Sequence, residues 1–272
     1  MVASDDVRTL YLDLLKRCLT NWIYRDSEWE KVAPTGAIER LLLKRSAPKG
    51  TFLARRIPFD PEKRRLGQDW PSNAHTMIGL RRLDNLQYCL EHAISAGVQG
   101  DFMETGVWRG GATIFMRGVL KAHGIIDRIV WAADSFEGLP RPDPVTYPAD
   151  EGDVHHGFDE LRVSLETVRA NFAAYGLLDE QVRFLKGWFR DTLPHAPVEQ
   201  LAVLRLDGDM YESTMIALQS LYPKLSIGGY IIIDDYCIKS CAQAVSDFRA
   251  TNTISEEIKP IDGTATFWRK QG

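Results

Sequence analysis

The sequence lacks the marks of several specialised protein classes. It has only four cysteines, none paired at the spacing of a zinc site. Its 33 Lys and Arg residues do not outnumber the 37 Asp and Glu residues, which argues against a large nucleic-acid surface. No apolar run reaches the length of a membrane span, and residues 1–17 lack a secretory apolar segment. We therefore expect a cytoplasmic protein with reduced thiols, and neither nucleic acid nor membrane as its partner.

The 272 residues, 44% of them hydrophobic, can bury one large core. Neither an internal repeat nor a polar linker divides the chain, but its beginning differs from the rest. Residues 5–24 have helical periodicity, and the charged segment 30–68 has little regular pattern. We interpret that segment as a solvated or mobile arm. The expected organisation is an N-terminal helical extension over 1–70 and one domain over 71–272.

Helical and strand patterns alternate from residue 76 onward. This alternation predicts right-handed crossovers and a mainly parallel α/β sheet with helices on both faces. A ligand is then expected beyond the carboxyl ends of the strands. The predicted helices are 76–97, 110–124, 164–176, 213–225 and 241–251, and the predicted strands are 100–108, 128–136, 181–188, 201–209, 228–236 and 265–270.

The first predicted strand ends at Glu104 and is followed by Gly106, Gly110 and Gly111. Glycines at this place let the backbone turn tightly and approach a ligand. An ordinary strand-to-helix turn is the alternative, because the spacing is not that of GxGxxG. Asp134, at the end of the second strand, can bind a ribose diol in nicotinamide-binding and S-adenosylmethionine-binding folds alike.

Two further strands each end in a pair of carboxylates. Asp207 and Asp209 follow the apolar run LAVLRL, and Asp234 and Asp235 follow GGYIII. Buried carboxylates at neighbouring strand ends repel one another unless they are paired or bind a cation. Three of them (Asp207, Asp234 and Asp235) can hold a divalent ion such as magnesium, which leaves Asp209 as a general base. The alternative is a set of helix caps and salt bridges, with Asp209 capping a helix that begins near Tyr211.

A long loop, 136–162, is rich in Pro, Asp and Gly. A loop of this length inside a domain is usually functional or disordered, and this one follows a strand end. We expect it to cover the site as a lid. His155 and His156 on this loop are rival general bases, and exposed loop histidines are the simpler interpretation.

Several long segments together resemble one known family. They read ETGVWRGGA, VWAADSFEGLP, NFAAYGLLDEQVRFLKGWFRDTLP, LAVLRLDGDMYESTM and GGYIIIDDYC, with AHTMIGLRRLDNLQYCL upstream. These segments are similar to the macrocin O-methyltransferase (TylF-like) family. The resemblance implies a Rossmann-like class I methyltransferase that depends on S-adenosylmethionine (SAM) and magnesium. It also implies a seven-stranded, mostly parallel sheet whose last strand is antiparallel.

The resemblance assigns roles to individual residues. Asp134 and Ser135 are expected to contact the ribose, and Gly187 and Trp188 to lie near the adenine, although Trp188 can equally belong to the core. Asp207, Asp234 and Asp235 are expected to hold magnesium, with Asp207 also near the cofactor, and Asp209 to act as the base. The methionine part of SAM is expected at Glu104, Thr105, Gly106, Val107, Gly110, Gly111 and Thr113.

The resemblance also implies an acceptor. It is a small-molecule glycoside, methylated on a (deoxy)sugar hydroxyl, as in aminocoumarin or macrolide antibiotics, and the enzyme is expected to be a homodimer. A polysaccharide such as a mannoside, or a phenol or catechol, remains an alternative acceptor. An NAD-dependent dehydrogenase would share the fold, but the glycine spacing disfavours it. A non-enzymatic binding module would leave the four aspartates unexplained.

Overall fold

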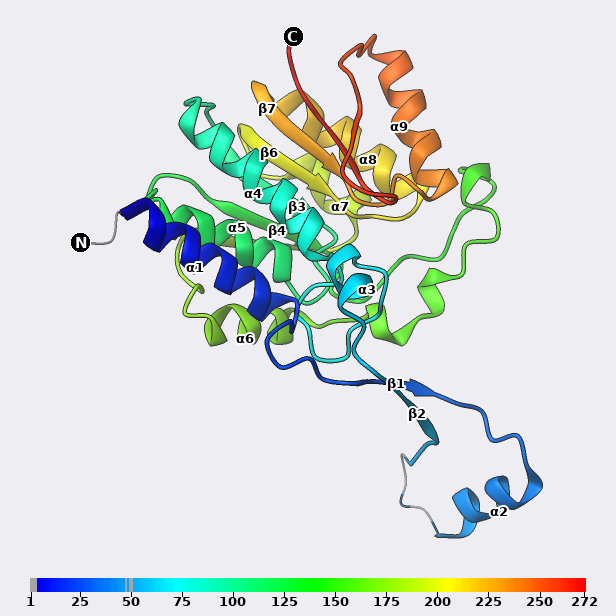
Figure 1. Cartoon of the computed structure of the whole chain (residues 1–272). Coiled ribbons are helices and arrows are strands. Elements are labelled where there is room, and N and C mark those ends of the chain that lie inside the picture. Colours follow the sequence, from blue (N-terminus) through cyan, green and yellow to red (C-terminus); the bar gives the residue numbers. More distant parts are fainter. Residues whose placement is uncertain (1–3, 47, 49–50) are drawn as a thin grey trace.

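The computed structural model describes residues 4–46, 48 and 51–272 (Figure 1). Its centre is a seven-stranded sheet with the order β5-β4-β3-β6-β7-β9-β8. The pairs from β5 to β7 are parallel, and β9 is antiparallel to both of its neighbours. This confirms the predicted class I methyltransferase sheet. The strands are β3 (Asp101–Thr105), β4 (Val130–Asp134), β5 (Val182–Lys186), β6 (Leu201–Leu206), β7 (Leu225–Ile233), β8 (Lys259–Pro260) and β9 (Thr266–Arg269).

Helices cover both faces of the sheet, and each face has its own apolar core (Figure 1). One core lies under α1 (Ser4–Leu19), α4 (Leu80–Ser95), α5 (Gly111–Ala122) and α6 (Leu165–Ala174). The other lies under α8 (Tyr211–Leu221) and α9 (Lys239–Thr251). The predicted helix over 213–225 ends early, because Pro223 lacks the N–H that would continue it and the chain passes into a 3₁₀ turn.

The helix α1 packs on the main domain. Leu12, Leu15 and Leu19 are buried in the same core as α5. Gly118 of α5 lies where a Cβ atom would come 2.4 Å from a methyl carbon of Leu15, so the two helices approach closely. The division of the chain at residue 70 stays a prediction. None of the helices in the described ranges is both long and apolar enough to cross a membrane.

The segment 30–68 has more structure than its pattern predicted. The strand β1 (Glu28–Lys31) pairs antiparallel with β2 (Ala54–Ile57), and with α2 (Ala37–Ser46) they extend away from the body (Figure 1). A short helix, α3 (Pro61–Leu66), then returns the chain to the domain. The interpretation as a solvated arm is wrong for Arg64 in α3. This side chain is 1% exposed and makes ion pairs of 2.6 Å with Glu28 and 2.7 Å with Asp69.

Candidate active site

The backbone turns sharply at the carboxyl ends of the parallel strands. Trp108 after β3, Phe136 after β4 and Asp209 after β6 have φ angles of 48°, 57° and 55°. Residues other than glycine seldom adopt this left-handed backbone conformation, and it is found preferentially at functional sites. These three turns lie together because parallel strands end at the same edge of the sheet.

One of the predicted glycines is required by a close approach of two loops. Gly106 has φ of +82°, and a Cβ atom there would lie 1.7 Å from the carbonyl oxygen of Asp207. The turn after β3 therefore passes directly against the turn after β6. Gly110 and Gly111 meet other neighbours: their nearest contacts are with Val168 and with His75.

The structure brings together three of the four predicted aspartates. Asp207, Asp234 and Asp235 each offer a carboxylate oxygen, and these oxygens lie within 4.8 Å of one another. Asp234 and Asp235 are buried, whereas Asp207 is partly exposed. Asp209 donates its backbone N–H to a carboxylate oxygen of Asp235 over 3.0 Å. A cluster of hard oxygen ligands at this separation fits a divalent cation such as magnesium.

Two buried arginines that the sequence reasoning missed lie beneath this cluster. Arg205 contacts Asp207 at 2.8 Å and Asp234 at 2.6 Å, and it also donates to Glu104. Arg82 pairs with Asp234 on its other side and with Asp262 at 3.2 Å. An arginine inside the apolar strand LAVLRLD was the available signal for Arg205, because a buried guanidinium needs carboxylate partners.

The arginines neutralise the cluster unevenly. Burial alone would raise the pKa of Asp234, but Arg205 and Arg82 hold it below its ordinary value. Asp235 has no arginine partner among the described residues, and burial together with Asp209 and Asp207 raises its pKa well above the usual range. Burial and then Asp207 raise the pKa of Asp209 to about 7. No arginine of the described residues therefore pairs with the side of the cluster formed by Asp235 and Asp209, and a bound divalent cation would supply positive charge there.

Two adjoining pockets meet at these residues. The tryptophan pocket is bounded by Trp108, Trp188 and Asp134, and the carboxylate pocket contains Asp207, Asp234 and Asp235. Both pockets open to solvent, and the space between their lining atoms, open solvent included, is about 770 and 910 Å³. Both pockets share the lining residues Met77, Trp108, Leu161, Asp207 and Asp209. A ligand in the tryptophan pocket can therefore reach a ligand in the carboxylate pocket.

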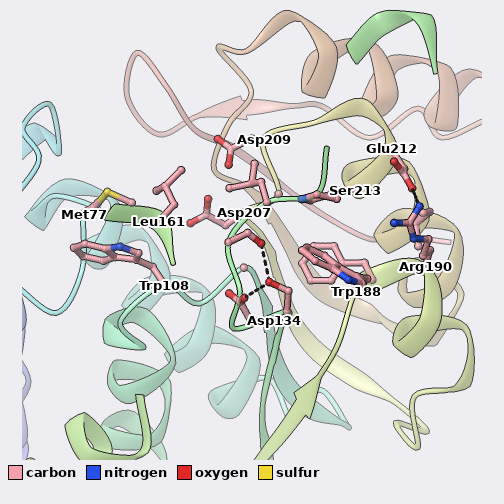
Figure 2. A pocket seen from close by; sticks show the side chains of 18 residues that line it. Met77, Trp108, Asp134, Leu161, Trp188, Arg190, Asp207, Asp209, Glu212 and Ser213 are labelled. Atoms are coloured by element: carbon pink, nitrogen blue, oxygen red, sulfur yellow. Dashed lines mark hydrogen bonds and ion pairs between the residues drawn. The ribbon is translucent and has the colours of Figure 1, made fainter. Parts of the chain in front are cut away.

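Figure 2 shows the two tryptophans on opposite sides of the tryptophan pocket, with Asp134 low between them. The Asp134 carboxylate accepts backbone N–H groups of Val107 at 2.8 Å and Phe136 at 2.7 Å. It thus fixes the turns after β3 and β4, and a carboxylate has further lone pairs to offer a ligand. Burial nevertheless raises its pKa.

The predicted site residues fall into two groups. Some line a pocket: Glu104, Gly106, Val107, Asp134, Ser135, Trp188, Asp207, Asp209, Asp234 and Asp235. The others line neither pocket: Thr105, Gly110, Gly111, Thr113 and Gly187. Thr113 acts on Glu104 instead, because its hydroxyl donates to the carboxylate that Arg205 also holds. Direct contact of the second group with a cofactor stays a prediction.

The long loop is attached to the site by Asp150. This side chain is 2% exposed and accepts the backbone N–H groups of Tyr211 at 2.6 Å and Glu212 at 3.0 Å. It therefore caps the N-terminus of α8, the helix that follows the Asp207–Asp209 turn. The alternative that Asp209 caps this helix is wrong, because Asp150 makes the bonds that such a cap would make.

Comparisons with known proteins agree with this geometry. A sequence model of the macrocin O-methyltransferase (TylF) family matches residues 8–270. The chain belongs to the macrocin O-methyltransferase family. As an O-methyltransferase of this family it is an enzyme, and membership implies SAM as the methyl donor. The alternatives of a nicotinamide dehydrogenase and of a non-enzymatic module are therefore wrong.

The macrocin O-methyltransferase family has named relatives similar to this chain over almost its whole length. One from Streptomyces olivaceus, the 8-demethyl-8-(2,3-dimethoxy-alpha-L-rhamnosyl)-tetracenomycin-C 4'-O-methyltransferase, is 55% identical over 98% of this chain and 94% of its own. The mycinamicin III 3''-O-methyltransferase of Micromonospora griseorubida is 50% identical over 96% of both chains. The solved structure of the O-methyltransferase NovP superimposes with a TM-score of 0.84, at 46% identity over 97% of this chain and 100% of its own.

Proposed function

We propose that this enzyme methylates a hydroxyl of a (deoxy)sugar on a glycosylated natural product, with magnesium as a second cofactor. The observation that carries the proposal is the cluster of Asp207, Asp234 and Asp235 in a pocket that adjoins the tryptophan pocket. The named relatives support the acceptor class, because they act on a rhamnosyl tetracenomycin and on mycinamicin III.

The tryptophan pocket is the proposed site of SAM. Asp134 and Ser135 would bind the ribose, and the ring of Trp188 would lie against the adenine. SAM, when bound there, supplies a methyl group that is open to attack by an oxygen. The shared lining of the two pockets lets the chain orient the acceptor oxygen towards that methyl group, and such alignment accounts for much of the rate.

The donor set of the carboxylate pocket fits magnesium. Asp207, Asp234 and Asp235 would hold the ion, while Arg205 and Arg82 keep Asp234 ionised from behind. Magnesium, when bound, supplies a Lewis acid that lowers the pKa of a hydroxyl beside it. Arg205 also makes an ion pair with Asp207. Two of the three proposed ligands, Asp207 and Asp234, therefore have fixed orientations before any ion is bound.

Asp209 is the proposed general base. A sugar alcohol is a weak acid, so a group near the attacking oxygen must accept its proton. The carboxylate of Asp209 lines both pockets and is placed by a left-handed backbone turn. The described lining of these pockets contains no lysine, and His155 is the other side chain in it that is a rival for this role.

The first test is transfer of labelled methyl from SAM to a panel of acceptors. The panel holds the rhamnosyl tetracenomycin, mycinamicin III, a short mannoside and a catechol, each with magnesium and with excess chelator. Magnesium-dependent label on a natural-product glycoside is the expected result. Label on the mannoside or catechol alone would overturn the sugar assignment, and full activity in chelator would remove the metal.

A homodimer in the cytoplasm is the accompanying proposal for assembly and location. Support for the dimer comes from α1, where Val7, Leu10 and Leu14 are exposed by 56%, 69% and 50%. Their spacing places them on one stripe of the helix, opposite the buried Leu12 and Leu15. Light scattering of the wild-type chain and of the Leu10→Glu variant would test this, with a dimer expected for the first and a monomer for the second.

A further inference from the structure

We propose that His155, oriented by Asp153, accepts a hydrogen bond from a hydroxyl of the bound acceptor and so selects the sugar. The inference rests on the proposed function and adds to it a residue that recognises the acceptor. It assigns His155 to binding, and leaves the reacting proton to Asp209.

Asp153 holds His155 at two points. One carboxylate oxygen accepts the backbone N–H of His155 over 2.9 Å, and the other lies 2.7 Å from Nδ1 of the ring. The carboxylate is itself mostly buried, with its side chain 11% exposed. A ring that donates its Nδ1 proton to a carboxylate presents the Nε2 lone pair on its opposite edge. That nitrogen is an acceptor, and a sugar hydroxyl is a donor that matches it.

The histidine lies where an acceptor must bind. His155 lines the carboxylate pocket together with Asp209 and the three proposed metal ligands. No residue in the described ranges makes a hydrogen bond to its Nε2 atom. The neighbouring His156 does not line this pocket, and its backbone carbonyl is used to accept from Arg162 over 2.9 Å. The two loop histidines therefore have different surroundings, although the sequence gives no reason to separate them.

The loop that carries His155 is fixed on both sides of it. Asp150 caps α8 on one side, and the indole N–H of Trp108 donates to the carbonyl of Glu160 on the other, over 2.8 Å. Because these contacts order the loop in advance, a hydrogen bond from the acceptor hydroxyl to His155 costs little further conformational entropy. This is the arrangement expected of a group that selects between similar acceptors.

Aromatic contacts extend the site outward from His155. The His155 ring meets Phe158 edge-on at 5.5 Å, and Phe158 meets Trp70 edge-on at 6.0 Å. Trp70 comes from the segment before α4 and also lines the carboxylate pocket. A polar site with an aromatic rim suits a glycoside, whose sugar is polar and whose aglycone is apolar.

The experiment compares the His155→Ala and His155→Gln variants with wild type and with His156→Gln as the matched control. The acceptor is whichever of the rhamnosyl tetracenomycin and mycinamicin III the wild-type enzyme methylates faster. We expect the KM for this acceptor to rise about tenfold in His155→Ala, the value of one hydrogen bond, and less in His155→Gln, which keeps a polar group. The KM for SAM, and the kinetics of His156→Gln, should stay at wild-type values.

Analogues of the acceptor that each lack one hydroxyl identify the hydroxyl that donates to His155. Removing that hydroxyl should weaken the wild-type enzyme about as much as His155→Ala does, and should weaken the variant no further. An unchanged acceptor KM in His155→Ala overturns the inference, as does a large fall in kcat at constant KM in both variants, since His155 would then take the proton. If wild type methylates neither glycoside, the proposed function fails, and the inference with it.

Discussion

The guanidinium of Arg205 lies 2.8 Å from the carboxylate of Asp207, and the same nitrogen donates to Glu104. One buried cation thus joins the acid at the end of β3 to the acid after β6. Its second nitrogen lies 2.6 Å from Asp234 of the next strand. Glu104, Asp207 and Asp234 therefore all contact one guanidinium, and a change at one of them alters the field at the others.

Asp209→Asn should lower kcat by about 100-fold to 10,000-fold, because the amide cannot accept the proton of the attacking hydroxyl. Asn tolerates the left-handed backbone at this position, so the turn should keep its shape. Turnover measures the first effect, and calorimetric binding of S-adenosylhomocysteine, expected at wild-type affinity, controls for the second. A near-normal rate would remove Asp209 from the role of base.

Asp235→Asn should raise the magnesium concentration needed for half-maximal activity by about tenfold or more, since one charged ligand is lost. Asp235 suits this test better than Asp234, whose removal would also take one carboxylate partner from each of two buried arginines. Titration of activity and of binding heat with magnesium measures the shift. Asp127→Asn is the control, because it removes the same charge from an exposed residue before β4, at the amino ends of the parallel strands. Its magnesium dependence should match that of the wild type.

Asp150→Ala should destabilise the protein by about 2 kcal/mol, because two N–H groups at the start of α8 lose their acceptor. Denaturant unfolding measures the loss. Asp143 also accepts two backbone N–H groups, those of Val145 and Thr146, but within a local turn and in an exposed position, so Asp143→Ala should change stability little. Equal effects of the two substitutions would contradict the proposed anchoring of the loop.

The pH dependence of stability should reveal Glu104 in the metal-free protein. Burial, only partly offset by Arg205 and Thr113, raises its pKa to about 7, whereas an unfolded Glu ionises near 4.3. The folded state then binds the extra proton. Its contribution is fully present below about pH 4.3 and is lost as pH rises through about 7.

Glu104→Gln isolates this effect, because the amide stays uncharged at every pH. Relative to that variant, wild-type stability in chelator should fall by on the order of 3 kcal/mol between pH 4 and 8. Denaturant unfolding of both proteins across this range measures the difference. A constant difference, or one that grows in favour of wild type with rising pH, would contradict the raised pKa.

The order of helices and strands was predictable from the sequence. Apolar runs of strand length alternate with helical patterns from residue 76 onward, and these periodicities are local properties of the chain. The two aspartate pairs were visible for the same reason, since Asp207 and Asp234 each directly follow such a run. The prediction failed in 30–68, where the strands β1 and β2 are four residues each and mostly exposed, so that no apolar alternation marks them.

The sequence by itself determined the sheet and the residues at its edge, whereas the tertiary structure decided which of them act together. Arg82 lies 152 positions before Asp234, and Asp150 lies 61 before Tyr211. Local patterns carry no information about such contacts, which follow from strand order and helix packing. The separation of His155 from His156 likewise came only from the fold, because adjacent residues on a turn point in directions that the closure of the loop decides.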